Sequence, residues 1–259
     1  MTYTQQELAE RLKIDQFPRA ATYDPEWVLE NKMGPNVLWL AEALGQVMDL
    51  QPGMRVLDMG CGRAASSIFL AKEFDLQVWA TDLWIKASDN WERVCAAGLQ
   101  EQVFPIHAEA RSLPFADAFF DALVSMDAYH YFGTDDLYLG YHFAKLVKPG
   151  GQIGIVVPGL ARELETGPPD YLQPYWDWEF GSFHSPDWWR RHWEKTGKVE
   201  VELADLIPDG WQHWLKWQEL CFEQNQQPYD EQEAGMLRAD AGRNLGFTRM
   251  VARRRQYAA

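Results

Sequence analysis

The 259-residue sequence has few cysteines and no long apolar run. Its three cysteines, Cys61, Cys95 and Cys221, form no C-x-x-C pair and have no histidine partner at metal-ligand spacing. We therefore expect reduced thiols, a cytoplasmic location and no bound metal. No stretch approaches the roughly 18 apolar residues of a membrane span, and the polar residues 1–15 lack the apolar core of a signal peptide.

Basic residues are also scarce, because 24 Lys and Arg stand against 38 Asp and Glu, a net charge of −14. A nucleic-acid groove needs a basic face, so DNA and RNA are not expected as partners. The basic run at 253–255 is expected to be a solvated strand end. The length fits one large domain with insertions, or a domain plus a small cap.

Helix and strand signals alternate over the first 158 residues. Strands are expected at 55–59, 76–82, 102–108, 120–127 and 152–158, and helices at 34–50, 66–74, 88–98 and 135–147. Continuous apolar strands separated by helices indicate a parallel sheet covered on both faces.

The pattern changes after residue 158. An aromatic, loop-like stretch at 159–186 precedes a helix, a strand at 199–206, a helical insert at 209–225 and a strand at 247–255. Late strands split by a helix predict an antiparallel pair at one sheet edge. The expected fold is a Rossmann-like α/β three-layer sandwich with seven mostly parallel strands, the last antiparallel.

A domain division accompanies this fold. Residues 1–33 are expected to form a helical cap, and 34–259 one domain with aromatic-rich lid insertions at about 159–186 and 207–246. Of the tryptophans, Trp188, Trp189 and Trp193 have helical spacing and are expected in the core.

A glycine-spaced turn follows the first strand. Gly60-Cys61-Gly62-Arg63-Ala64-Ala65 fits the dinucleotide pattern G-x-G-x-x-G/A, but Asp58 puts a negative charge where a pyrophosphate would lie. Asp82 ends the second strand, a position suited to accepting hydrogen bonds from a ribose diol. A ligand with a ribose, a positive group and no phosphate suits two acids without a phosphate-binding lysine. S-adenosylmethionine has these features.

Two alternatives stay open. A nicotinamide-dependent oxidoreductase fits the glycine pattern but is disfavoured by Asp58 and by the late antiparallel strands. A noncatalytic S-adenosylmethionine-binding protein on the same scaffold is also compatible with the residues.

Four segments carry a family resemblance: "VLDMGCGRA", "ATDLW", "AEARSLPFADAFFDALVSMDAYHYF" and "LVKPGGQIGIVVP". In this order they resemble the motifs of class I S-adenosylmethionine-dependent methyltransferases, in the small-molecule group that includes the ubiquinone-biosynthesis type. The resemblance covers about 34–158 and extends to the late strands by topology.

The resemblance implies a set of cofactor-binding residues. Asp58, Gly60 and Gly62 match the motif around the methionine part, with Cys61 as a small residue inside the turn. Asp82 matches the acid that holds the ribose hydroxyls, and Leu83 the apolar neighbour of the adenine. Three further positions line the pocket in the family: Glu109, Ala110 and Met126. Glu109 as a solvated acid and Met126 as ordinary core are the alternatives.

Substrate and catalysis are less defined by the sequence. Aromatic residues in the segments that cover the active site suit a small apolar or aromatic metabolite, and ring faces can also hold cations. His130 follows the fourth strand and is the candidate general base, with His184 and Tyr131 as lesser candidates. The signature for methylating nucleic-acid amines is missing at this position, where the chain reads "SMDAYHY".

Overall fold

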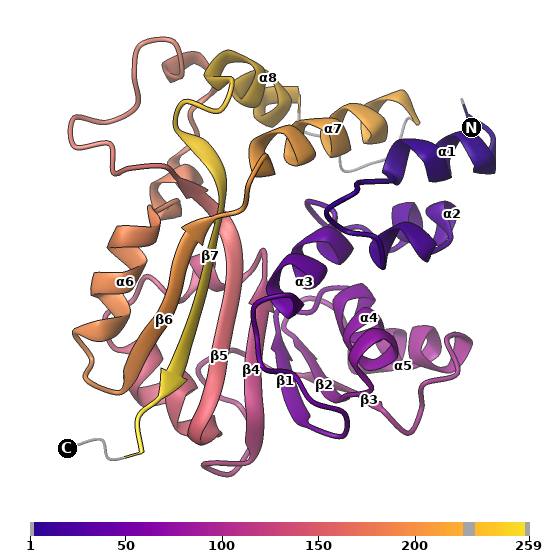
Figure 1. Ribbon diagram of the computed structural model, residues 1–259, viewed down its shortest axis with the longest axis vertical. Coiled ribbons are helices and arrows are strands. Elements are labelled where there is room, and N and C mark those ends of the chain that lie inside the picture. The colour runs from indigo at the N-terminus through magenta and orange to yellow at the C-terminus, as the bar shows by residue number, and fades with distance from the viewer. Residues whose placement is uncertain (1–2, 225–230, 257–259) are drawn as a thin grey trace.

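The computed structural model describes residues 3–224 and 231–256, and these form a single seven-stranded sheet with flanking helices (Figure 1). The strands are β1 (Arg55–Met59), β2 (Gln77–Asp82), β3 (Val103–His107), β4 (Phe120–Met126), β5 (Val147–Leu160), β6 (Val199–Leu206) and β7 (Leu245–Arg254). None of the described helices is long and apolar enough to cross a membrane.

The strand order across the sheet is β3-β2-β1-β4-β5-β7-β6. Strands β1 to β5 pair in parallel, whereas β7 runs antiparallel to both β5 and β6. This confirms the predicted mostly parallel, seven-stranded sheet with an antiparallel last strand. The order reverses between β1 and β4, and ligands of open α/β sheets bind at such a reversal, outside the carboxyl ends of the strands.

Two apolar clusters lie on opposite faces of the sheet and give the molecule three layers. Along a strand, successive residues alternate between them: Val56 and Val124 belong to one, Leu57 and Leu123 to the other. The first cluster includes residues of α3 (Val37–Gly45), α4 (Ala65–Phe74), α5 (Ala87–Ala96) and α7 (Gly210–Glu223). The second includes residues of 129–146 and of α6 (Pro186–Glu194).

The predicted helix at 135–147 is wrong in type. The chain forms a π-helical turn at Leu139–Phe143 and a 3-10 turn at Ala144–Leu146. A π turn brings residues five apart onto one side, and the buried rings of Tyr138 and Phe143 stack with centroids 5.8 Å apart. Packing in the second cluster thus overrides the regular α-helix that the local sequence favours.

Near the C-terminus the structure adds one helix that the sequence did not predict, α8 (Glu231–Asp240). Together with α7 and the segment 159–186 it lies beyond the carboxyl end of β5 (Figure 1). That segment contains only two short 3-10 turns, Gln173–Tyr175 and Trp178–Ser182. Its loop-like character was predicted.

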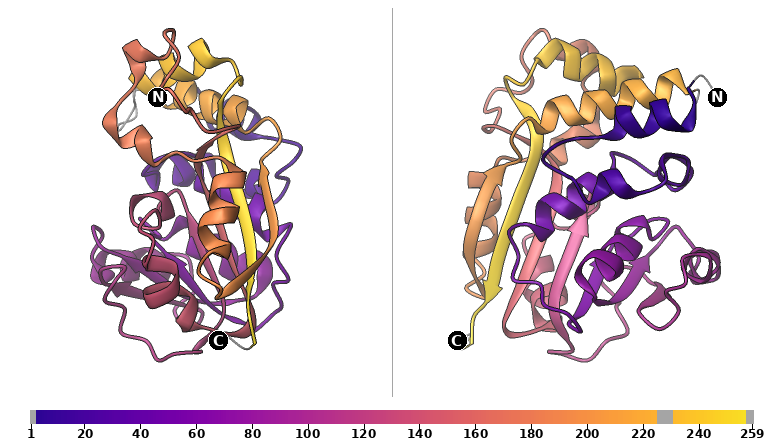
Figure 2. Two further views of the ribbon diagram at one scale, coloured as in Figure 1. Left: turned by 90° about the vertical axis from the view of Figure 1, so that its left-hand side faces the viewer. Right: turned by 45° about the vertical axis from the view of Figure 1, so that its right-hand side comes forward.

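The N-terminal helices α1 (Gln5–Leu12) and α2 (Pro25–Glu30) lie on the same side as α7 (Figure 2). Nη1 of Arg11 is 3.1 Å from Oε2 of Glu223, which joins α1 to the end of α7. The division into a cap at 1–33 and a domain at 34–259 stays a prediction.

The predicted core tryptophans of α6 have different environments. Trp189 and Trp193 are completely buried, as predicted. Trp188 is half-buried, with its ring stacked between His184 and His192. In α7, Trp214 and Trp217 are also buried, whereas Trp178 is 84% exposed. Most of these rings therefore stabilise the fold.

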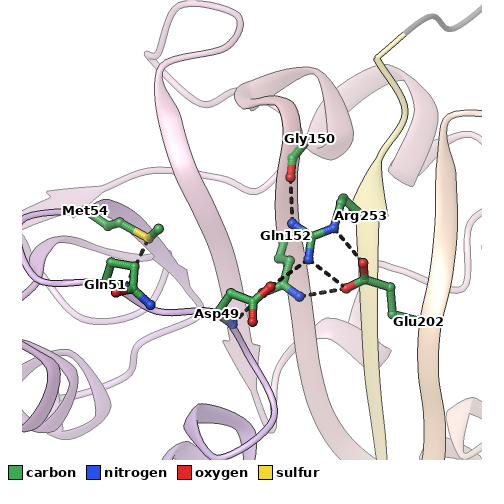
Figure 3. A network of polar contacts seen from close by, with 7 residues as sticks. All are labelled: Asp49, Gln51, Met54, Gly150, Gln152, Glu202 and Arg253. Carbon is green, nitrogen blue, oxygen red and sulfur yellow. Dashed lines mark hydrogen bonds and ion pairs between the residues drawn. The ribbon is translucent and has the colours of Figure 1, made fainter.

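Arg253 of β7 ties three segments together at the amino end of β5 (Figure 3). Its guanidinium donates to Oδ2 of Asp49 at 2.8 Å, to Oε1 of Glu202 at 2.5 Å and to the carbonyl of Gly150 at 2.8 Å. Gln152 continues the network by donating to Oε2 of Glu202 at 2.7 Å.

We expect Arg253→Ala to lower the free energy of unfolding by about 1 kcal/mol, because its ion pairs are partly exposed and each contributes little. The loss should shrink at high salt, which screens exposed charges. Urea denaturation at low and high salt measures both effects, with the exposed Arg162→Ala as the control. Equal stability of wild type and Arg253→Ala would contradict the role of the network.

Candidate active site

A cavity of about 290 Å³ lies at the reversal of the strand order. Its walls come from the ends of β1, β2, β3 and β4 and from the segment 31–37. Of the predicted cofactor residues, eight line it: Gly60, Cys61, Gly62, Asp82, Leu83, Glu109, Ala110 and Met126. Positions scattered along the sequence thus form one wall because parallel strands end at the same sheet edge.

The turn after β1 requires glycine at two positions. Gly60 has φ +76° and Gly62 has φ +53°, a region that glycine enters without steric cost. A Cβ on Gly60 would lie 2.3 Å from Cβ of Ala128, and one on Gly62 would lie 2.8 Å from Sδ of Met33. Side chains there would fill the edge of the cavity, so the turn forms a cradle for a ligand.

Hydrogen bonds hold this turn against the end of β2. The N–H groups of Gly60 and Cys61 donate to the carbonyl of Thr81 at 2.8 and 3.1 Å, and that of Gly62 donates to Oδ2 of Asp82 at 2.9 Å. These three N–H groups are satisfied within the protein. They are not available to a pyrophosphate, in contrast to the glycine loop of a dinucleotide-binding site.

Asp82 links the turn to the cavity. Its Oδ1 accepts hydrogen bonds from the N–H groups of Trp84 at 2.7 Å and Ile85 at 2.9 Å. The residue is 7% exposed and lines the cavity. A carboxylate oxygen can accept more than one hydrogen bond, so Asp82 retains acceptor capacity toward a ligand hydroxyl.

Asp58 does not line the cavity, which differs from the predicted contact with a ligand. It is fully buried, and its Oδ2 accepts hydrogen bonds from the hydroxyls of Ser66 at 2.6 Å and Ser67 at 2.7 Å. Its Oδ1 has no hydrogen-bond partner among the described residues. Burial raises the pKa of Asp58 to about 6. The residue supports the turn from behind, at the start of α4.

The other predicted cofactor residues form the mouth and floor of the cavity. Leu83 is half-exposed, whereas Ala110 and Met126 are buried, and all three line the cavity. Glu109 is paired with Arg111, whose Nη1 lies 3.4 Å from Oε1 and whose N–H donates to Oε2 at 2.7 Å. That pairing reduces the capacity of Glu109 to bind a ligand amino group.

Of the three predicted catalytic residues, His130 and Tyr131 lie together and His184 lies apart. Tyr131 lines this cavity and a neighbouring one. His130 is 3% exposed and lines the neighbouring cavity, and burial lowers its pKa to about 3. His184 lines neither: its Nδ1 is 3.0 Å from Oε2 of Glu163, and its ring stacks on Trp188 at 3.6 Å. The prediction of His184 at the site is thus not supported, because its partners hold it outside both cavities.

Comparison with known proteins identifies the domain. Residues 56–151 match a family model described as a methyltransferase domain. The chain is 33% identical over 147 residues to demethylmenaquinone methyltransferase of Corynebacterium efficiens, a match covering 48% of this chain and 60% of the relative. These matches support the interpretation of the chain as a class I S-adenosylmethionine-dependent methyltransferase. The cofactor of this family is S-adenosylmethionine.

Other similarities differ in extent. Phosphoethanolamine N-methyltransferase 3 of Arabidopsis thaliana is 30% identical over 125 residues, covering 48% of this chain and 25% of the relative. The chain thus spans less than two thirds of these curated relatives. Phosphoethanolamine N-methyltransferase 2 of Haemonchus contortus, solved with phosphomonomethylethanolamine and S-adenosylhomocysteine, superposes with a TM-score of 0.71. That match has 21% identity, covers 96% of this chain and 60% of that one, and shows the shared fold.

Sequence reasoning missed one acid that lines this cavity, Asp127. It directly follows β4, lines both cavities and has φ +53°. Burial raises its pKa to about 7. The available signal was its position at a strand end, the same feature that pointed to Asp58 and Asp82.

We expect Asp58→Asn to change the pH dependence of stability. The folded-state pKa of Asp58, about 6, exceeds its ordinary value of 3.8, so the folded state binds this proton more tightly than the unfolded chain. The resulting stabilisation is complete below about pH 4 and is lost as the pH rises through 6.

Asparagine does not titrate. The free energy of unfolding of Asp58→Asn minus that of wild type should therefore increase by roughly 2 kcal/mol between pH 4 and pH 7, at about 1.4 kcal/mol per pKa unit. Urea denaturation at both pH values measures this difference, with the exposed Asp15→Asn as a matched control. A difference that is constant with pH would show that Asp58 does not titrate in this range.

Proposed function

We propose that this protein transfers a methyl group from S-adenosylmethionine to a small metabolite. The observation that carries the proposal is the cavity formed by the glycine turn at 60–62 and Asp82 at the end of β2. Its fit to the cofactor rests on the cradle that side chains at Gly60 and Gly62 would fill and on the acceptor capacity of Asp82. The relatives described above support the same reaction.

Each wall of the cavity has a role in this proposal. Asp82 accepts hydrogen bonds from the ribose hydroxyls, and the backbone of Gly60 to Gly62 allows close approach of the amino-acid part. Leu83 and Met126 provide apolar surface for the adenine, with Ala110 beside them. Asp58 acts indirectly, because it holds Ser66 and Ser67 at the first turn of α4.

The protein's chemical task is mainly alignment. S-adenosylmethionine supplies a methyl group already activated by a sulfonium, so the residues of the chain need to orient the acceptor and exclude water. Where the acceptor must lose a proton, Asp127 is a better candidate than His130. A histidine whose pKa is about 3 is a weak proton acceptor at neutral pH.

The nicotinamide alternative loses support from the turn itself. A dinucleotide site offers free N–H groups to a pyrophosphate, whereas Gly60, Cys61 and Gly62 donate to Thr81 and Asp82. A noncatalytic S-adenosylmethionine-binding protein would bind the cofactor equally well. Formation of S-adenosylhomocysteine with an acceptor distinguishes it from an enzyme.

The proposal includes a small apolar or aromatic metabolite as substrate, no nucleic-acid partner and a cytoplasmic location. Phe180 and Phe183, beside the cofactor cavity, support an apolar contact with the substrate. The net charge of −14 disfavours a nucleic acid, and the dispersed cysteines suit a reducing compartment.

We expect Asp82→Ala to weaken binding of S-adenosylmethionine and S-adenosylhomocysteine roughly 10- to 100-fold, because ribose hydroxyls without an acceptor cost about 1.5–3 kcal/mol. The smaller change Asp82→Asn retains one acceptor oxygen and should lose less. Isothermal titration calorimetry measures both affinities, with the exposed Asp15→Ala as the control. Unchanged affinity in Asp82→Ala would refute the assignment of the cavity to this cofactor.

A further inference from the structure

A second cavity, of about 210 Å³, adjoins the cofactor cavity. The two share five lining residues: Met33, Gly34, Pro35, Asp127 and Tyr131. A single water needs only about 10–15 Å³ of such space, so the second cavity has room for a small molecule. A molecule there would meet the contents of the first cavity at the wall that Asp127 and Tyr131 form.

Three carboxylates line this second cavity. Asp127 follows β4, Glu179 lies in the 3-10 turn Trp178–Ser182, and Glu233 lies in α8, where it accepts a hydrogen bond from Gln218. Among the described residues that line the cavity there is no lysine or arginine. The pKa of Tyr131 is raised first by partial burial and then by the charges of these three carboxylates, so all three lie within electrostatic reach of its hydroxyl.

Aromatic rings form a continuous wall beside the carboxylates. Tyr131 contacts His130 with ring centroids 4.1 Å apart, His130 contacts Phe183 at 5.9 Å, and Phe183 stacks on Phe180 at 5.0 Å. Since burial lowers the pKa of His130 to about 3, its imidazole is neutral and does not offset the negative charge. The cavity therefore combines ring faces with carboxylates, and no lysine or arginine is among its described lining residues.

His130 gives independent evidence of a ligand. Its side chain is 97% buried (3% exposed) and lines the second cavity. Its Nδ1 has no hydrogen-bond partner among the described residues. A buried polar atom without a partner costs free energy, and a ligand that donates a hydrogen bond to the neutral imidazole would remove that cost.

The backbone is built to place Asp127 at the shared wall. Its φ of +53° is unfavourable for most residues with a Cβ, although aspartate and asparagine tolerate it. Gly34 leaves room for the carboxylate, since a Cβ there would lie 2.3 Å from Oδ2 of Asp127. Both features keep a charged group at the junction of the two cavities.

We infer that the second cavity binds an amine with an apolar body, and that the nitrogen of this amine is the methyl acceptor. The inference rests on the proposed function and names its substrate class. Carboxylates attract an ammonium group and aromatic faces hold it by cation–π contact. A phosphate or carboxylate substrate would instead be repelled by three like charges. The sequence indicated an apolar or aromatic substrate. The three carboxylates add the requirement that this substrate carries a positive charge.

The reaction moves one methyl group and one positive charge from sulfur to nitrogen. The bound ammonium first loses a proton to Asp127 or to solvent, which frees the nitrogen lone pair. The nitrogen then forms a bond to the methyl carbon while the carbon–sulfur bond breaks, and its electron pair remains on sulfur as S-adenosylhomocysteine. The positive charge passes from sulfur to nitrogen, and the methylated ammonium leaves.

The test uses three sets of probes. Within each set the carbon skeleton is kept and the functional group is a cationic amine, a neutral alcohol or an anionic carboxylate. The sets are propylamine, propanol and propionate; phenethylamine, 2-phenylethanol and phenylacetate; and tryptamine, tryptophol and indole-3-acetate. Their affinities are measured by calorimetry on the full chain saturated with S-adenosylhomocysteine. We expect at least one amine to bind tenfold or more tightly than its alcohol, with no binding of its carboxylate. With S-adenosylmethionine, mass spectrometry should detect the N-methylated amine.

Variants locate the effect at the three carboxylates. Asp127→Asn suits the left-handed backbone and should weaken binding of the amine tenfold or more, with a smaller change in binding of its alcohol. Glu179→Gln and Glu233→Gln should show smaller losses. Glu165→Gln is the matched control, because it removes an equal charge from an exposed position of the segment 159–186 outside the cavity. An equal loss for amine and alcohol in Asp127→Asn would overturn the inference.

Failure of the inference is distinguishable from failure of the proposed function. If S-adenosylhomocysteine does not bind to wild type, the proposed function fails. If it binds but none of the amines does, or the alcohols bind as tightly, the proposed function stands and the amine inference is refuted.

Discussion

The geometry of the site depends on the hydrogen bonds that join the glycine turn to the end of β2. The N–H groups of Gly60 and Cys61 share the carbonyl of Thr81, and Asp82 accepts from Gly62 on one oxygen and from Trp84 and Ile85 on the other. One carboxylate therefore fixes two loops from different strands. Because both loops line the cavity, its shape is established before a ligand binds, which lowers the entropic cost of binding.

Burial assigns different chemical properties to acids and bases of the same type. Asp58 is fully buried behind the turn, with a pKa raised to about 6, whereas Asp82 remains at the cavity edge among backbone donors. His130 is neutral because burial disfavours its charged form, and His184 is held by Glu163 away from both cavities. Residue type alone would not separate these roles, since each follows from desolvation and partners.

The late inserts of the chain supply the charge and the rings that distinguish the second cavity. Glu179 and Phe183 come from the segment 159–186 and Glu233 from α8, whereas Asp127 directly follows β4 of the sheet. In the proposed function, the sheet positions the methyl donor, and the inserts determine which acceptor can lie beside it. A common fold can in this way serve different acceptors, because the function lies in the site and not in the fold.

Local sequence determined the sheet and the cofactor side of the site. Apolar runs, glycine spacing and acids at strand ends are short-range signals, so all seven strands, the turn at 60–62 and Asp82 followed from them. Tertiary structure decided which of those residues reach the cavity: Asp58 does not, and Asp127 does. It also decided the π turn at Leu139–Phe143 and the gathering of Asp127, Glu179 and Glu233. These outcomes depend on packing between residues far apart in the chain, and no local pattern encodes such contacts.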